Sequence, residues 1–207
     1  MVFNDRTQAG NLLAEKLSSY RGSAAVVVGL ARGGAATACA VSDTLKLSLD
    51  VLVVKKISAP GEAELAIGAL APDDVSFIDW RFAQRLGVDE KYIKEAISHQ
   101  SSAIREKSLL YRKGRKPYRF KEKIVILVDD GAATGATIEA AIKWLKKKHA
   151  SKIIVALPVA PKELLQKISP EVDGLVVLET PHDFRAVGEF YQTFEQLTDK
   201  EVIELLA

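Results

Sequence analysis

Short runs of consecutive apolar residues recur along the chain and alternate with stretches whose apolar residues fall at helical spacing. A continuous apolar run predicts a parallel strand buried on both faces, because an exposed face would alternate polar with apolar residues. Such runs predict strands at 25–30, 49–54, 124–129, 153–157 and 174–178. Their alternation with helices predicts an α/β fold with a doubly wound, mostly parallel sheet, whose functional loops leave the carboxyl ends of the strands.

Helical spacing predicts the connecting elements. A helix over residues 5–20 has Asp5 as its N-cap and shows no evident chemistry, so packing is its expected role. A longer helix is expected over 89–111. Thr198 and Glu201 have the spacing of a capping box, which predicts the start of a last helix.

One predicted strand ends in two adjacent carboxylates, Asp129 and Asp130, and a loop of small residues leads from them into an amphipathic helix. The loop consists of Gly131, Ala132, Ala133, Thr134, Gly135, Ala136 and Thr137. Small residues let backbone N–H groups close on an anion at a helix N-terminus, where the helix dipole also favours negative charge. The lysine of a P-loop is absent, so the pattern predicts a phosphate cradle but not a P-loop ATPase.

A second strand–loop–helix unit carries a fixed cation where the first carries acids. Its loop consists of Ala31, Arg32, Gly33 and Gly34. The strand at 49–54 ends in Lys55 and Lys56, and the segment 58–74 shows no clear period and is rich in Ala, Gly, Pro and acidic residues. A loop of this length in a compact domain is typical of a functional lid or a disordered link. Residues 75–78 are expected to form a short edge strand or an arm of the lid.

Composition narrows the class of protein. The 207 residues suit a single domain over 1–207, and 48% hydrophobic residues suffice for a full core. A net charge of +2, from 29 basic and 27 acidic residues, argues against a nucleic-acid binder. The basic, aromatic segment 111–123 is the best local candidate for such binding, although a solvated connector is the favoured interpretation.

Cysteine content and hydropathy narrow the class of protein further. A single cysteine, Cys39, excludes an internal disulfide framework and a multi-cysteine metal site. No apolar run reaches the ~18 residues of a membrane span, and no signal-peptide pattern is present. We therefore expect a cytoplasmic protein without membrane contact.

The motifs resemble, in order, those of the type I phosphoribosyltransferases, and the resemblance covers nearly the whole chain. VDDGAATGAT is similar to the loop that binds phosphoribosyl pyrophosphate (PRPP), ARGG to the loop that grips its pyrophosphate, and KKISAPGEAELAIGA to the flexible catalytic loop. The closest subgroup is one of predicted phosphoribosyltransferases, in which proline is expected where Ala31 stands. The resemblance implies a lid loop at about 55–80, a hood at about 158–195, Mg²⁺ as the cofactor and a homodimer.

The resemblance also implies roles in PRPP binding. Asp129 and Asp130 would hold the two ribose hydroxyls and lie near Mg²⁺, which PRPP and water would mostly coordinate. Residues 131–137 would bind the 5′-phosphate. Residues 31–34, together with Lys56, would bind the pyrophosphate.

Catalytic and acceptor-binding residues follow in the same way. Lys55 and Lys56 would stabilise the charge that builds on the departing pyrophosphate, and Glu64 is the preferred carboxylate of the lid. Phe184 would stack on an acceptor ring and Val187 would form a wall beside it. Packing within the hood is the alternative for both residues.

Two functions from different classes remain. The first is a phosphoribosyltransferase that acts on a nitrogenous base or related acceptor, and the second is a non-catalytic PRPP or nucleotide sensor of the same fold. Arg32 and the paired lysines favour the enzyme, because binding of a 5′-phosphate alone needs no pyrophosphate grip. Ala133 stands where hypoxanthine–guanine enzymes carry an aspartate, so this loop offers no catalytic base of its own.

Overall fold

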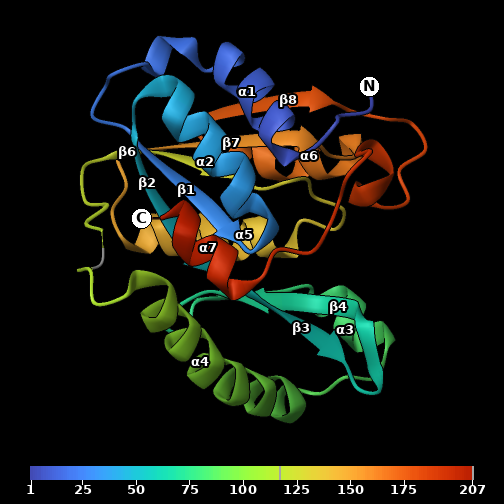
Figure 1. Ribbon diagram of the computed structural model, residues 1–207. Helices are drawn as coiled ribbons and strands as arrows, with labels where there is room; N and C mark the ends of the chain where they lie inside the picture. Colours follow the sequence, from blue (N-terminus) through green and yellow to red (C-terminus); the bar gives the residue numbers. More distant parts are fainter. Residues whose placement is uncertain (117, 207) are drawn as a thin grey trace.

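The computed structural model describes residues 1–116 and 118–206, without the side chains of Ala63 and Glu64. Its centre is a five-stranded sheet in the order β2-β1-β6-β7-β8, in which all neighbours pair in parallel (Figure 1). The strands are β1 (Val26–Ala31), β2 (Ser48–Val53), β6 (Ile124–Val128), β7 (Lys152–Val159) and β8 (Gly174–Glu179). The α/β fold and the five predicted strands are confirmed.

Alternate residues of the central strands face opposite layers of helices. The covering helices are α1 (Arg6–Lys16) and α2 (Gly33–Leu45) on one face, and α5 (Ala136–Lys147) and α6 (Lys162–Ile168) on the other. In β1, Val26 and Val28 pack toward α5, whereas Val27 packs toward α1 and α2. Gly29 lets α2 approach closely, since an added β-carbon would lie 2.8 Å from Ala38 Cβ. Burial on both faces explains the continuous apolar runs.

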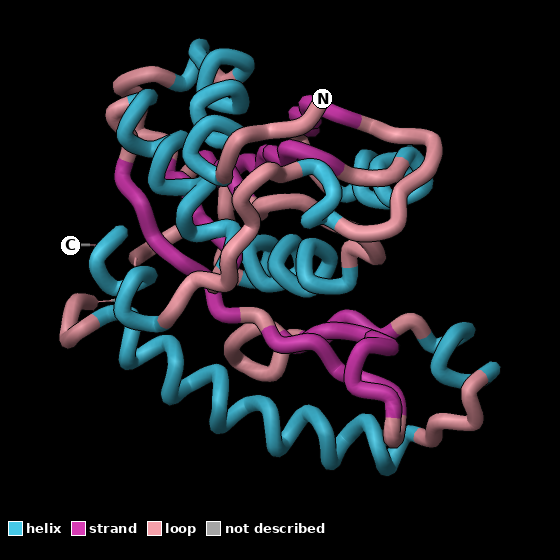
Figure 2. The backbone as a smooth tube through the Cα atoms, turned by 45° about the vertical axis from the view of Figure 1, so that its right-hand side comes forward, coloured by secondary structure: helices cyan, strands magenta, loops and turns pink. Residues whose placement is uncertain are grey.

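The segment 55–80, predicted as a flexible loop, is largely a second, antiparallel sheet in the order β3-β4-β5. Its strands, and the helix that follows, are β3 (Lys55–Ala59), β4 (Glu62–Leu70), β5 (Ser76–Ile78) and α3 (Trp80–Arg85). This sheet lies between α5 and the long helix α4 (Glu90–Arg112), as Figures 1 and 2 show. Ile57 and Ile67 pack toward α4, and Ala69 packs toward α5. Helices distant in sequence therefore stabilise these strands, which local composition does not reveal.

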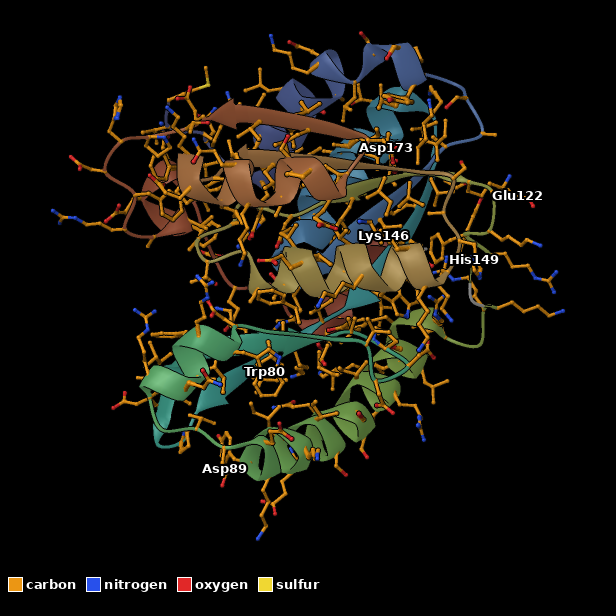
Figure 3. The ribbon with its side chains drawn as sticks, turned by 180° about the vertical axis from the view of Figure 1, so that it is seen from behind. Trp80, Asp89, Glu122, Lys146, His149 and Asp173 are labelled. Atoms are coloured by element: carbon orange, nitrogen blue, oxygen red, sulfur yellow. The ribbon has the colours of Figure 1, made fainter. Side chains whose placement is uncertain are left out.

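Several helices begin at a residue whose side chain caps them. Asp5 caps α1, and Asp89 caps α4 (Figure 3), each by accepting a hydrogen bond from a backbone N–H three residues on. The predicted capping box of Thr198 and Glu201 opens the last helix. The remaining elements are η1 (Ser18–Tyr20), η2 (Ser169–Glu171), η3 (Val187–Phe190) and α7 (Asp199–Leu205). Of the helices in the described residues, none has both the length and the apolarity needed to cross a membrane.

The N-terminus lies beside the C-terminal segment, which we define as residues 184–198 and which runs from β8 toward α7 (Figure 1). Phe3 N donates to Phe190 O and Gln192 N donates to Phe3 O, both at 2.8 Å. The buried ring of Phe3 lies 5.4 Å from that of Tyr191, between centroids. These contacts fix the C-terminal segment against the start of α1.

Candidate functional site

Two adjacent carboxylates stand at the carboxyl end of β6, the middle strand of the parallel sheet. Asp129 and Asp130 are partly buried, and the Asp130 N–H donates to Asp129 Oδ1 at 2.9 Å. Burial first, and the charge of Asp130 second, raise the pKa of Asp129 well above its ordinary value. Paired acids with a perturbed pKa are typical of functional sites.

The Gly33-Gly34 turn packs directly on these carboxylates. A β-carbon at Gly33 would lie 1.9 Å from Asp130 Oδ2, and one at Gly34 would lie 2.7 Å from Asp129 Oδ1. Glycine is therefore required at both positions while the acids keep their places. The peptide bond Ala31–Arg32 just before the turn is cis. Two of the predicted loops are thus in direct contact.

The loop 131–137 presents backbone N–H groups without partners. Gly135 (φ +76°) caps the start of α5, and no described residue accepts a hydrogen bond from the amides of 133–138. Thr134 is exposed and Thr137 is partly buried. The dipole of α5 adds partial positive charge at the same point. An anion with several oxygens, such as a phosphate, fits this arrangement.

Three predicted cations make no side-chain hydrogen bond or ion pair with the described residues, although the charge of Arg32 acts on Tyr111 and Asp199. Arg32 is partly buried at the start of α2, and its guanidinium makes no hydrogen bond or ion pair with the residues that the structure describes. Lys55 and Lys56 open β3, partly buried and exposed respectively, and neither forms an ion pair within the same residues. The side chain of Glu64 lies outside the described part of the chain. Its catalytic role stays a prediction.

The two candidate acceptor-binding residues lie in different surroundings. Val187 packs on the loop of small residues, because a β-carbon at Gly131 would lie 2.6 Å from Val187 Cγ1. Phe184 stacks on Phe190, with 5.7 Å between ring centroids and 12° between the planes. Val187 therefore borders the candidate site directly, whereas the structure records Phe184 in contact with another aromatic ring.

Arg6 and Tyr191 belong to the site and were missed by the sequence analysis. Arg6 Nε donates to Asp130 Oδ2 at 2.8 Å, and the Tyr191 hydroxyl donates to the Asp130 carbonyl at 2.6 Å. The first helix was expected only to pack, and Arg6 shows that this expectation was incomplete. An arginine after an N-cap carries no signal that points to a carboxylate 124 positions away.

Asp129 and Asp130 suit a metal ion that a bound substrate also coordinates better than one held by protein side chains alone. Among the described residues, no group of three or more His, Cys, Asp or Glu side chains could hold a metal ion. Asp129 and Asp130 still supply the carboxylate oxygens that Mg²⁺ prefers, and Mg²⁺ keeps several waters and often binds through substrate phosphates. The donor set therefore fits an ion held mainly by a diphosphate and water.

Comparison with known proteins places the chain in a family. The family model of the phosphoribosyl transferase domain matches residues 6–190. Curated proteins from two strains of Mycobacterium tuberculosis, provisionally named phosphoribosyl transferases, are 36% identical over 205 residues. The match covers 99% of this chain and 46% of each relative, so the chain spans about half the length of these relatives.

Solved structures agree on the fold. A crystal structure of a protein from Thermus thermophilus is 37% identical and has a TM-score of 0.82. The match covers 100% of this chain and 98% of that one. A hypoxanthine phosphoribosyltransferase from Staphylococcus aureus is 14% identical with a TM-score of 0.51, over 89% of this chain and 79% of that one, and shows the fold alone. With a family model that covers most of its length, this chain belongs to the phosphoribosyl transferase domain family.

Proposed function

We propose that the chain, as a homodimer, transfers the 5-phosphoribosyl group of PRPP to a nitrogenous base or related small acceptor and releases pyrophosphate. The contact of the Gly33-Gly34 turn with Asp129 and Asp130 carries this proposal. It sets a loop suited to a pyrophosphate beside carboxylates suited to a ribose. A protein that binds only a 5′-phosphate has no need of that juxtaposition.

Binding of PRPP would use three neighbouring groups of atoms. The free N–H groups of 133–138 and the hydroxyls of Thr134 and Thr137 would surround the 5′-phosphate. Asp129 and Asp130 would accept hydrogen bonds from the two ribose hydroxyls, which charged acceptors strengthen. The turn at residues 31–34 would hold the pyrophosphate.

Transfer breaks the bond between ribose C1′ and a pyrophosphate oxygen, which leaves with the electron pair, and forms a bond from C1′ to an acceptor nitrogen. The carbon passes through an oxocarbenium-like state. Arg32, Lys55 and Lys56 would stabilise the growing negative charge on the pyrophosphate, while the two acids lie on the ribose side, near the growing positive charge. The cations therefore contribute more in the transition state than in the ground state.

Mg²⁺ would supply further positive charge on the diphosphate, held beside Asp129 and Asp130 mainly by substrate and water. The antiparallel sheet, whose first strand carries Lys55 and Lys56, would cover the site and limit the access of water. Water has to be limited because it competes with the acceptor for C1′.

The acceptor is proposed to lie beside Val187, which borders Gly131. Phe184 stacks on Phe190, so to contact an acceptor ring it would have to move away from Phe190 or use the opposite face of its own ring. Because Ala133 offers no base, the acceptor proton would pass to Glu64 or to water. An acceptor that is already a good nucleophile suits such a site.

A panel of purine and pyrimidine bases, incubated with PRPP and Mg²⁺, tests the proposal through the release of pyrophosphate. We expect release with one acceptor class, and less release at low PRPP concentration with an Asp130→Asn variant. Binding of PRPP without release for any acceptor would instead indicate the alternative function, a non-catalytic PRPP or nucleotide sensor.

A further inference from the structure

Arg6 joins the Asp130 carboxylate to the C-terminal segment. Besides its bond to Asp130, it donates from Nη1 to the carbonyl of Glu195 at 2.7 Å, and its guanidinium lies 4.0 Å from the centre of the Phe194 ring. The side chains of Arg6 and Asp130 are only 11% and 14% exposed. At such low exposure, removing one partner leaves the other charge buried without its counter-charge, which is costly.

A second connection runs in parallel with the first. The Tyr191 hydroxyl donates to the Asp130 carbonyl, and the Tyr191 ring stacks on that of Phe194 at 4.9 Å between centroids. The C-terminal segment is therefore attached to both the side chain and the backbone of Asp130. The same segment carries Val187, which packs on Gly131.

The carboxylate of Asp130 keeps one oxygen for a ligand. Arg6 engages Oδ2, and the Asp129 carboxyl interacts with the same carboxylate, but no N–H of the described residues donates to Oδ1. The carboxylate lies beside the Gly33 backbone, in the space that a β-carbon would otherwise take. A ribose hydroxyl can therefore donate to Oδ1 while Arg6 stays on Oδ2.

We propose that Arg6 is a positioning residue that couples the ribose subsite at Asp130 to the C-terminal segment, so that bound PRPP orders the segment next to the acceptor. This inference rests on the proposed function. A ribose hydroxyl that donates to Oδ1 fixes the Asp130 carboxylate. Arg6, bonded to a fixed carboxylate, then loses less conformational entropy when it binds Glu195 and Phe194. By linkage, an ordered segment in turn strengthens PRPP binding.

Hydrogen exchange of residues 187–195, with and without PRPP and Mg²⁺, tests the coupling alongside calorimetric titration of PRPP. The variants are Arg6→Met, which keeps the bulk and removes the charge, and Arg6→Lys, which keeps the charge and removes the planar donors. Arg21→Met is the matched control, because Arg21 also binds a backbone carbonyl, that of Thr44, outside the site. Thermal melts of each variant identify any loss of folding.

In the wild type and in Arg21→Met, PRPP is expected to slow exchange in 187–195. Arg6→Met should lose this slowing and bind PRPP roughly 10-fold more weakly. Arg6→Lys should regain part of the affinity but not the slowing, and it decides the question by itself if Arg6→Met does not fold.

Two outcomes overturn the inference in distinguishable ways. If the wild type binds PRPP but Arg6→Met, or Arg6→Lys alone, shows wild-type affinity and slowing, the coupling through Arg6 is wrong and the proposed function stands. If the wild type binds no PRPP, the proposed function fails and this inference fails with it.

Discussion

Gly33 leaves no room for a side chain beside Asp130, since a β-carbon there would lie 1.9 Å from Oδ2 and 3.1 Å from Oδ1. The backbone of Gly33 does not itself demand glycine, because its φ lies outside the left-handed region. The residue is thus needed for the position of the carboxylate. This makes it a direct probe of the contact between the two loops.

Gly33→Ala is expected to displace the Asp130 carboxylate and to weaken PRPP binding by about tenfold or more, while the chain still folds. Calorimetric titration measures the affinity. Gly87→Ala is the control, because a β-carbon there meets nothing within 4 Å although its φ of +69° makes the substitution strained. Equal PRPP affinity in both variants would contradict the assigned contact.

Asp129→Asn is expected to stabilise the protein and to impair PRPP binding. Burial and the neighbouring Asp130 raise the pKa of Asp129 in the folded state, so its ionised form opposes folding at pH 7. The amide oxygen can still accept the bond from Asp130 N. We expect a rise of a few degrees in Tm in thermal melts without ligand, since about 1 kcal/mol shifts Tm by roughly 2–4 °C at this chain length. An unchanged or lower Tm would argue against the buried charge.

Substitutions of Asp130 and Lys56 are expected to impair different steps of the reaction. Asp130→Asn should mainly weaken PRPP binding, because it removes the charged acceptor for the ribose. Lys56→Ala should mainly lower kcat, because its charge contributes most as pyrophosphate departs. Lys152, exposed at the opposite end of the parallel sheet, provides a Lys152→Ala control. The reverse pattern in steady-state kinetics would refute these roles.

Asp199 provides a prediction about pH and stability. Hydrogen bonds from Lys107 and then Tyr111, both on α4, lower the pKa of Asp199 at the start of α7. An acid with a lowered folded pKa adds stability above its unfolded pKa and loses that contribution as the pH falls through the folded pKa. Asp199→Asn should therefore lower Tm by a few degrees at most at pH 7 and by progressively less in acid. Thermal melts between pH 7 and pH 3 measure this, and an equal drop throughout would contradict it.

The parallel sheet and its loops were predictable from the sequence because their signals are local. Continuous apolar runs mark strands covered on both faces, and β6 leads directly into Asp129 and Asp130. The meeting of Gly33 and Gly34 with the two acids also followed from the sequence, because parallel strands place their carboxyl ends at one edge of the sheet. The capping residues Asp5 and Asp89 likewise act within one helical turn.

The parts that were missed depend on partners far along the chain. Strands β3 to β5 pair with one another, but α4 and α5 cover them, and the composition of 58–74 predicted a loop. Arg6 meets Asp130 only because the N-terminus lies beside the C-terminal segment. No sequence pattern around Arg6 or Asp130 predicts their contact, so the first helix was expected only to pack.

Titration of PRPP into the protein by calorimetry, with and without Mg²⁺, tests the central claim most directly. The site described above predicts saturable binding of one PRPP per chain with Mg²⁺, weakened at least about tenfold when the ion is removed, because the diphosphate then loses its counter-charge. Absence of PRPP binding in the presence of Mg²⁺ would contradict the proposed site and both functions built on it.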